Sequence, residues 1–232
     1  MEDRWLQVEE HTLTGGPFPT LLLAGHDERH GLVGFQEIPG VQPAEVQARL
    51  EQIRAGEWDR VAELMLSSSR KLASAGADFL ICPDNTIHQA FDRVASESPL
   101  PWIHIAEPVT SRAREKELKK LLIMGTEFLM SGPVYPDFLS KAGIAFEIPD
   151  DEDRRLINNI IFNELVNGIF TSESRAYFDT VIHFMKDRGC DGVVMGCTEI
   201  PLLLDPAVSP LPLLDSTRLL AEAAVREALR ED

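Results

Sequence analysis

The sequence has few cysteines and no long apolar segment. Three cysteines among 232 residues are too few for the disulfide framework of a small secreted domain. No run approaches the roughly 18 apolar residues that span a bilayer, and residues 1–5 lack the basic segment and apolar core of a signal peptide. We therefore expect a cytoplasmic protein with no membrane partner.

Basic residues are also scarce. The chain carries 22 Lys and Arg against 38 Asp and Glu, a formal net charge of −16. Because phosphate backbones are bound through clustered Lys and Arg, we expect no nucleic-acid partner. The sequence also lacks metal-ligand spacing, a phosphate-binding loop and a lysine in a pyridoxal-phosphate context, so neither a metal nor a cofactor is expected. A small carboxylate stays open as a ligand, because it is bound by local amides and side chains.

What the sequence does contain is an internal repeat. The stretch GCDGVVMGCTEI at residues 189–200 shares its Gly-x-Asp, apolar run and polar turn with GADFLICPDNTIH at residues 76–88. The tetrapeptide Ser-Pro-Leu-Pro occurs at residues 98–101 and again at residues 209–212. Repeats of this kind predict two similar halves, and strict registration from Gly-x-Asp places Asp84 opposite Cys197.

Apolar strand-like segments alternate with helical patterns in both halves. Strands alternating with helices indicate an α/β fold with parallel sheets covered on both faces. The expected helices are at residues 43–56, 59–75, 128–142, 152–166, 172–188 and 216–229, and the expected strands at residues 79–82, 102–105, 121–124, 144–148 and 192–195. For the first strand, residues 20–25 and a segment ending at the turn of residues 15–17 remain alternatives, so residues 1–34 stay unassigned.

The repeat and the alternation together predict the architecture. We expect two similar α/β halves related by a pseudo-two-fold axis, with the active site in the cleft between them. The N-terminal domain would comprise residues 1–112 plus 212–232, and the C-terminal domain residues 113–211.

Asp84 and Cys197 follow equivalent strands, and ligands of open parallel sheets bind beyond the carboxyl ends of strands. Racemising an α-carbon requires one acid/base group on each face, and a thiol and a carboxyl on opposite walls supply them. A thiol in a turn at a helix N-terminus has its thiolate favoured, while desolvation favours a protonated carboxyl. Two other interpretations remain: Asp84 is a helix N-cap, or Cys197 is a small buried residue.

Further polar residues flank these two positions. Hydroxyl and amide side chains beside backbone amides bind a substrate carboxylate, although the same residues also serve as ordinary helix caps. The candidate substrate-binding residues are Asn85, Thr86, Thr126 and Thr198. His88, His104 and Glu199 are expected to support the site from behind, with Glu199 orienting the Cys197 loop, and Cys82 and Cys190 are interpreted as structural.

These motifs resemble the aspartate/glutamate racemase superfamily. The resemblance is carried by Gly-Cys-Thr-Glu at residues 196–199 and Asn-Thr-Ile-His at residues 85–88, and it covers roughly residues 55–218. It implies two α/β domains, an active site on a pseudo-two-fold axis, and cofactor-independent chemistry performed by a pair of thiols. We therefore predict an isomerase of amino-acid metabolism that acts at the α-carbon of a small carboxylate such as an amino acid.

Three features depart from the family pattern. Asp84 stands where the first thiol is expected, and Leu156 stands where members that act on acidic amino acids carry lysine. The glycine-rich loop after the first strand has no clear match in residues 1–34. We accordingly predict Cys197 and Asp84 as the acid/base pair and leave the substrate, the preferred direction and the oligomer open, a homodimer included.

Two alternative functions remain. A decarboxylase or lyase on the same fold would protonate a carbanion from one side with Cys197 alone. A non-catalytic relative would only bind a ligand.

Overall fold

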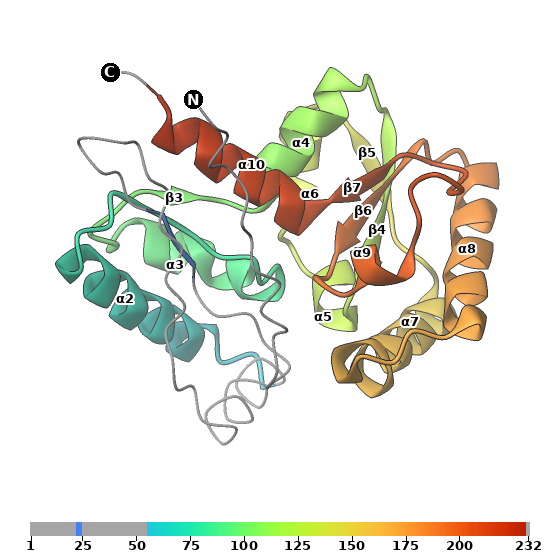
Figure 1. Cartoon of the computed structure of the whole chain (residues 1–232), viewed down its shortest axis with the longest axis horizontal. Helices are drawn as coiled ribbons and strands as arrows, with labels where there is room; N and C mark the ends of the chain where they lie inside the picture. The colour runs from blue at the N-terminus through green and yellow to red at the C-terminus, as the bar shows by residue number, and fades with distance from the viewer. Residues whose placement is uncertain (1–21, 25–54, 231–232) are drawn as a thin grey trace, which may run out of the picture.

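The computed structural model describes residues 22–24 and 55–230. The helix expected over residues 43–56 and the turn at residues 15–17 therefore lie outside the described residues, apart from the end of that helix. Within the described chain, two sheets form two lobes (Figure 1). The last helix, α10 (Ser216–Ala228), leaves the second lobe and runs toward the first.

The first sheet has the strand order β1-β2-β3, made of β1 (Leu22–Ala24), β2 (Phe79–Ile81) and β3 (Trp102–Ile103). Strands β2 and β3 are parallel, as expected, but β1 pairs with β2 in the antiparallel direction. The expectation of parallel strands is therefore wrong for β1. Strand direction depends on where the connecting chain enters the sheet, which the alternation of elements does not specify. The helices of this lobe are α2 (Trp58–Ser74), the 3₁₀ helix η1 (Thr86–Ala90) and α3 (Phe91–Ala95).

The second sheet is parallel throughout, with the order β5-β4-β6-β7. Its strands are β4 (Lys120–Gly125), β5 (Ala145–Glu147), β6 (Gly192–Gly196) and β7 (Leu213–Asp215). The elements around it are α4 (Ala106–Glu115), α5 (Glu127–Met130), α6 (Pro136–Lys141), α7 (Asp151–Asn163), η2 (Leu165–Asn167), α8 (Ser172–Asp187) and α9 (Ile200–Leu203).

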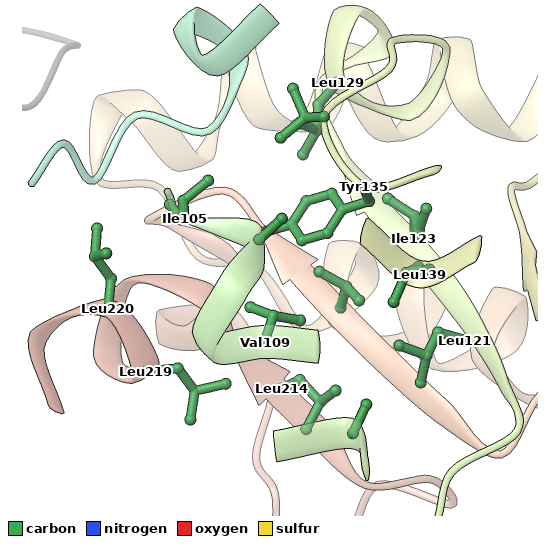
Figure 2. Close-up of a cluster of buried hydrophobic side chains, with 14 of the residues drawn as sticks. Ile105, Val109, Leu121, Ile123, Leu129, Tyr135, Leu139, Leu214, Leu219 and Leu220 are labelled. Atoms are coloured by element: carbon green, nitrogen blue, oxygen red, sulfur yellow. The ribbon is translucent and has the colours of Figure 1, made fainter. Parts of the chain in front are cut away.

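Strand β4 shows why this sheet is apolar on both faces. Successive side chains of a strand point to opposite faces, so Leu121 and Ile123 join a core with α4, α6 and α10 (Figure 2). Leu122 and Met124 join a second core with α7 and α8 on the other face. A strand covered on both sides reads as a continuous apolar run, which is the pattern seen in the sequence.

One expected helix is divided. Residues 128–142 form α5 and α6 instead of a single helix. Pro133 and Pro136 cause the break, because proline lacks the backbone N–H that a helix interior needs and is tolerated at the first helical position. Pro136 occupies that position in α6.

The internal repeat is confirmed in local structure. Gly76 and Gly189 end the helices before β2 and β6 with the same positive φ of 91°. The hydroxyls of Ser98 and Ser209 each donate to the carbonyl two residues on, at 2.7 Å and 2.8 Å. Each serine precedes a strand that pairs in parallel with the preceding repeated strand. The pseudo-two-fold relation between the halves stays a prediction.

The domain boundaries also stay a prediction. Strand β7 lies in the range expected to return to the first domain, yet it pairs with β6 of the second sheet. The core around α4 and α10 contains Phe79 and Ile81 of the first sheet as well as strands of the second. The two lobes therefore share buried apolar surface at α4 and α10.

Candidate functional site

The Cys197 turn begins where β6 ends beside β4. Gly125 and Gly196 are partners in the register of these strands, so Thr126 and Cys197 leave adjacent strand ends. A Cβ at Gly196 would lie 2.1 Å from Cδ2 of Leu129, and one at Gly125 would lie 2.7 Å from the same atom. Helix α5 thus packs directly on the strand ends, where a backbone oxygen would also lie 3.0 Å from the Cβ at each position, so glycine is favoured at both positions and Thr126 lies near Cys197.

Cys197 is half-buried and its thiol donates a hydrogen bond to Oε2 of Glu199, at 2.9 Å. Burial raises the pKa of the Cys197 thiol well above its ordinary value, and the negative charges of Glu199 and Asp84 raise it further. The expectation that the turn favours the thiolate is therefore wrong. Glu199 contacts Cys197 as expected, and its contact stabilises the protonated thiol.

Asp84 begins the equivalent turn after β2. Its Oδ1 accepts hydrogen bonds from the backbone N–H of Thr86, at 2.8 Å, and of Ile87, at 3.4 Å. This is the capping contact that formed one of the two interpretations of Asp84. The negative charge of Asp84 is the last and smallest of the contributions that raise the pKa of the Cys197 thiol. The role of Asp84 in proton transfer stays a prediction.

Two of the predicted threonines meet between the lobes. The hydroxyls of Thr86 and Thr126 are 3.3 Å apart, and the Thr126 hydroxyl also caps α5 by accepting from the N–H of Leu129. Gln89 adds a second contact, because its Nε2 donates to the carbonyl of Phe128 at 2.9 Å. Thr198 is half-buried next to Cys197. Hydroxyl groups from both lobes thus gather at the strand ends.

Asn85 is held by side chains that the sequence does not point to. Its Oδ1 accepts from the hydroxyl of Tyr135 at 2.5 Å, and its Nδ2 donates to Oγ of Ser216 at 3.0 Å. Ser216 in turn donates to the carbonyl of Met195 at 2.8 Å. The sequence marks Ser216 only as a helix start, and Tyr135 has no motif of its own. The predicted contact between Asn85 and a substrate stays a prediction.

His88 and His104 form a ring cluster behind the Asp84 turn. Their ring centroids are 4.5 Å apart, and His104 stacks on Phe138 of α6 at 4.3 Å. His88 Nε2 donates to the carbonyl of Cys82 at 3.0 Å, and His104 Nδ1 accepts from the N–H of Ala106. Burial lowers the pKa of His88 to about 4; burial and the neighbouring His88 lower the pKa of His104 to about 2. Both rings are therefore neutral near pH 7 and support the turn by packing.

The two remaining cysteines, Cys82 and Cys190, are buried. Across residues 22–24 and 55–230, three or more His, Cys, Asp or Glu side chains nowhere gather as metal ligands would. In the same part of the chain, every helix is too short or too polar to cross a membrane.

Comparison with known proteins adds the family. Residues 29–224 match the family model described as Asp/Glu/Hydantoin racemase. The chain belongs to this family. Racemases are isomerases, so the predictions of the family, of its α/β fold and of a racemase-like isomerase are confirmed.

Individual relatives agree with this assignment. A broad specificity amino-acid racemase, RacX of Bacillus subtilis (strain 168), is 25% identical over 169 residues, which cover 73% of each chain. A crystal structure of a provisionally named Asp/Glu racemase from Yersinia pestis has a TM-score of 0.73 and 32% identity, over 83% of this chain and 87% of that chain. An aspartate racemase homologue from Pyrococcus horikoshii OT3 has a TM-score of 0.67 and 26% identity, over 73% and 74% of the two chains.

Proposed function

We propose that this protein is a racemase that uses Cys197 and Asp84 as opposed acid/base groups at the α-carbon of a small carboxylate, such as an amino acid. The observation that carries the proposal is the placement of the two groups. They follow the repeated strands β2 and β6, and the Asp84 carboxylate is close enough to raise the pKa of the Cys197 thiol. Proton transfer on both faces of one carbon needs two such groups.

The state of the thiol sets the direction of the first transfer. Cys197 is protonated, so it donates a proton to one face of the α-carbon while Asp84 removes the proton from the other face. This leaves Cys197 as a thiolate and Asp84 protonated, the form that catalyses the reverse reaction. Glu199, at 2.9 Å from the sulfur, is positioned to accept or return the thiol proton when the two forms interconvert.

The substrate carboxylate is assigned to the hydroxyl groups at the strand ends, those of Thr86, Thr126 and Thr198. Two carboxylates, Asp84 and Glu199, already flank this position, and a second substrate carboxylate would be repelled by them. Leu156, where a lysine is expected in members that act on acidic amino acids, is exposed on α7. We therefore favour a neutral or basic amino acid over aspartate or glutamate.

The test is solvent-deuterium incorporation at Cα across a panel of L- and D-amino acids. For the Asp84→Asn variant, which keeps the capping oxygen, we expect racemisation to fall by about 10² to 10⁴ with little change in stability. Asp205→Asn is the matched control, because Asp205 Oδ1 makes a similar turn contact with the N–H of Ala207 in an exposed loop. Incorporation into both enantiomers at the wild-type rate in Asp84→Asn would refute the two-base assignment.

One observation favours a second candidate function, a decarboxylase or lyase. A thiol whose pKa is raised is a proton donor, and a decarboxylase or lyase that protonates a carbanion from one side needs only that donor. Release of carbon dioxide from a malonate-type substrate, with a product of one configuration, would identify this activity. Asp84→Asn would then retain turnover.

A further inference from the structure

We infer that Tyr135 and Ser216 are positioning residues that hold the Asp84 turn against β6, the strand that ends directly before Cys197. The inference rests on the proposed function, because it assigns these residues a role in aligning the two acid/base groups. Neither residue touches the reacting atoms in this assignment.

The connection is a continuous chain of hydrogen bonds across both lobes. Tyr135 donates to Asn85, Asn85 donates to Ser216, and Ser216 donates to the carbonyl of Met195. Asn85 directly follows Asp84, and Met195 lies two residues before Cys197. The chain therefore starts at Tyr135, passes through the residue that follows Asp84, and ends on the strand that precedes Cys197.

The chain has one consistent direction. Ser216 uses its single hydroxyl proton for the Met195 carbonyl, so it accepts from Asn85, which requires Nδ2 to face it. Oδ1 then faces Tyr135, whose hydroxyl donates; burial raises the pKa of Tyr135, which keeps that hydroxyl protonated. A flipped amide would bring Oδ1 against the Ser216 oxygen, whose proton is used for the Met195 carbonyl, so the Asn85–Ser216 bond would be lost.

Burial makes the chain rigid. Tyr135 and Ser216 are 0% exposed and Asn85 is 3% exposed, so water does not compete for these bonds. The Tyr135 ring lies among Ile105, Ile123 and Leu129 in the apolar core (Figure 2). The apolar core thus holds the Tyr135 hydroxyl from one side, and buried hydrogen bonds connect the Asp84 turn to β6. The Tyr135 hydroxyl also interacts with Ser216 itself.

Removing one hydroxyl at either end tests the inference. Tyr135→Phe breaks the chain at Asn85 Oδ1, and Ser216→Ala breaks it at Nδ2 and at the Met195 carbonyl. Because small displacements of reacting groups cost up to about 10²-fold in rate, we expect kcat to fall by about 10- to 100-fold with KM changed much less. Tyr177→Phe is the control, since its hydroxyl donates to Asp153 between α7 and α8. That variant should keep the wild-type kcat.

A second measurement does not depend on turnover. The rate at which iodoacetamide alkylates Cys197 at a fixed pH depends on the position and surroundings of the thiol. We expect this rate to change in Tyr135→Phe and in Ser216→Ala, and to stay at the wild-type value in Tyr177→Phe. Both measurements are made below the unfolding temperature of each variant. If only one of the two variants folds, that variant alone is enough to test the inference. A folded variant with wild-type kcat and wild-type alkylation overturns the inference. If the wild-type protein exchanges no amino acid at Cα, the proposed function fails, while the alkylation rates still decide whether the chain positions Cys197.

Discussion

The buried histidine pair makes the stability of this protein sensitive to mild acid. His88 is 3% exposed and its Nε2 donates to the Cys82 carbonyl. Its Nδ1 is buried and has no hydrogen-bond partner among the residues that the structure describes. Because burial lowers the pKa of His88 from 6.5 to about 4, the folded protein holds the ring neutral in a range where the unfolded chain protonates it. His104 is affected in the same direction.

The sign and size of the effect come from this difference in pKa. A lowered pKa gives a contribution to stability that is present above pH 6.5 and is lost as the pH falls below it. At about pH 5.5 the unfolded His88 is mostly charged and the folded His88 is neutral, which lowers the free energy of unfolding by between about 1 and 2 kcal/mol. The loss from His88 levels off as the pH falls through about 4, where the folded ring also protonates.

The assay is urea unfolding at about pH 7.5 and about pH 5.5 for the wild-type protein and for His88→Gln. Glutamine can still donate to the Cys82 carbonyl but does not titrate, so the variant should lose about 1 to 2 kcal/mol less than the wild type between the two pH values. His183→Gln, at an exposed position on α8, should behave as the wild type does. An equal loss in wild type and His88→Gln would show that His88 is not held neutral by burial.

Three further predictions concern the Cys197 turn. Cys197→Ser should reduce turnover to near background with an unchanged unfolding midpoint, because a hydroxyl is a much weaker acid than a thiol; near-normal activity would remove Cys197 from the mechanism. Burial would still raise the pKa of the Cys197 thiol in Glu199→Gln, but the loss of the neighbouring charge should shift the pH profile of Cys197 alkylation to lower pH, and an unshifted profile would contradict the role given to Glu199. Gly196→Ala should lower stability by about 1 to 3 kcal/mol and also reduce turnover, because its Cβ would lie 2.1 Å from Leu129 Cδ2 and 3.0 Å from the Met124 carbonyl oxygen. Thermal unfolding at the wild-type midpoint would show that α5 does not need glycine there.

The sequence by itself determined the internal repeat and which positions of the two halves correspond to each other. The similar spacings of Gly-x-Asp (113 residues, from 76 to 189) and of Ser-Pro-Leu-Pro (111 residues, from 98 to 209) were enough to match β2 with β6 in the repeat, and so to make Asp84 and Cys197 equivalent positions. Apolar runs and helical periodicity were enough to predict the α/β fold class, because both are patterns of neighbouring residues in the sequence. The Gly-Cys-Thr-Glu motif was enough to point to the family.

Only the tertiary structure decided the properties that depend on distant neighbours. The direction of β1 depends on how the chain crosses the sheet, and local patterns do not contain it. The pKa of the Cys197 thiol is raised because burial and the carboxylate of Glu199 outweigh the backbone amides of its turn. Asn85 finds its partners 50 and 131 residues away, in Tyr135 and Ser216. The sequence thus identified the groups at the strand ends, while packing across the two lobes set their protonation and their orientation.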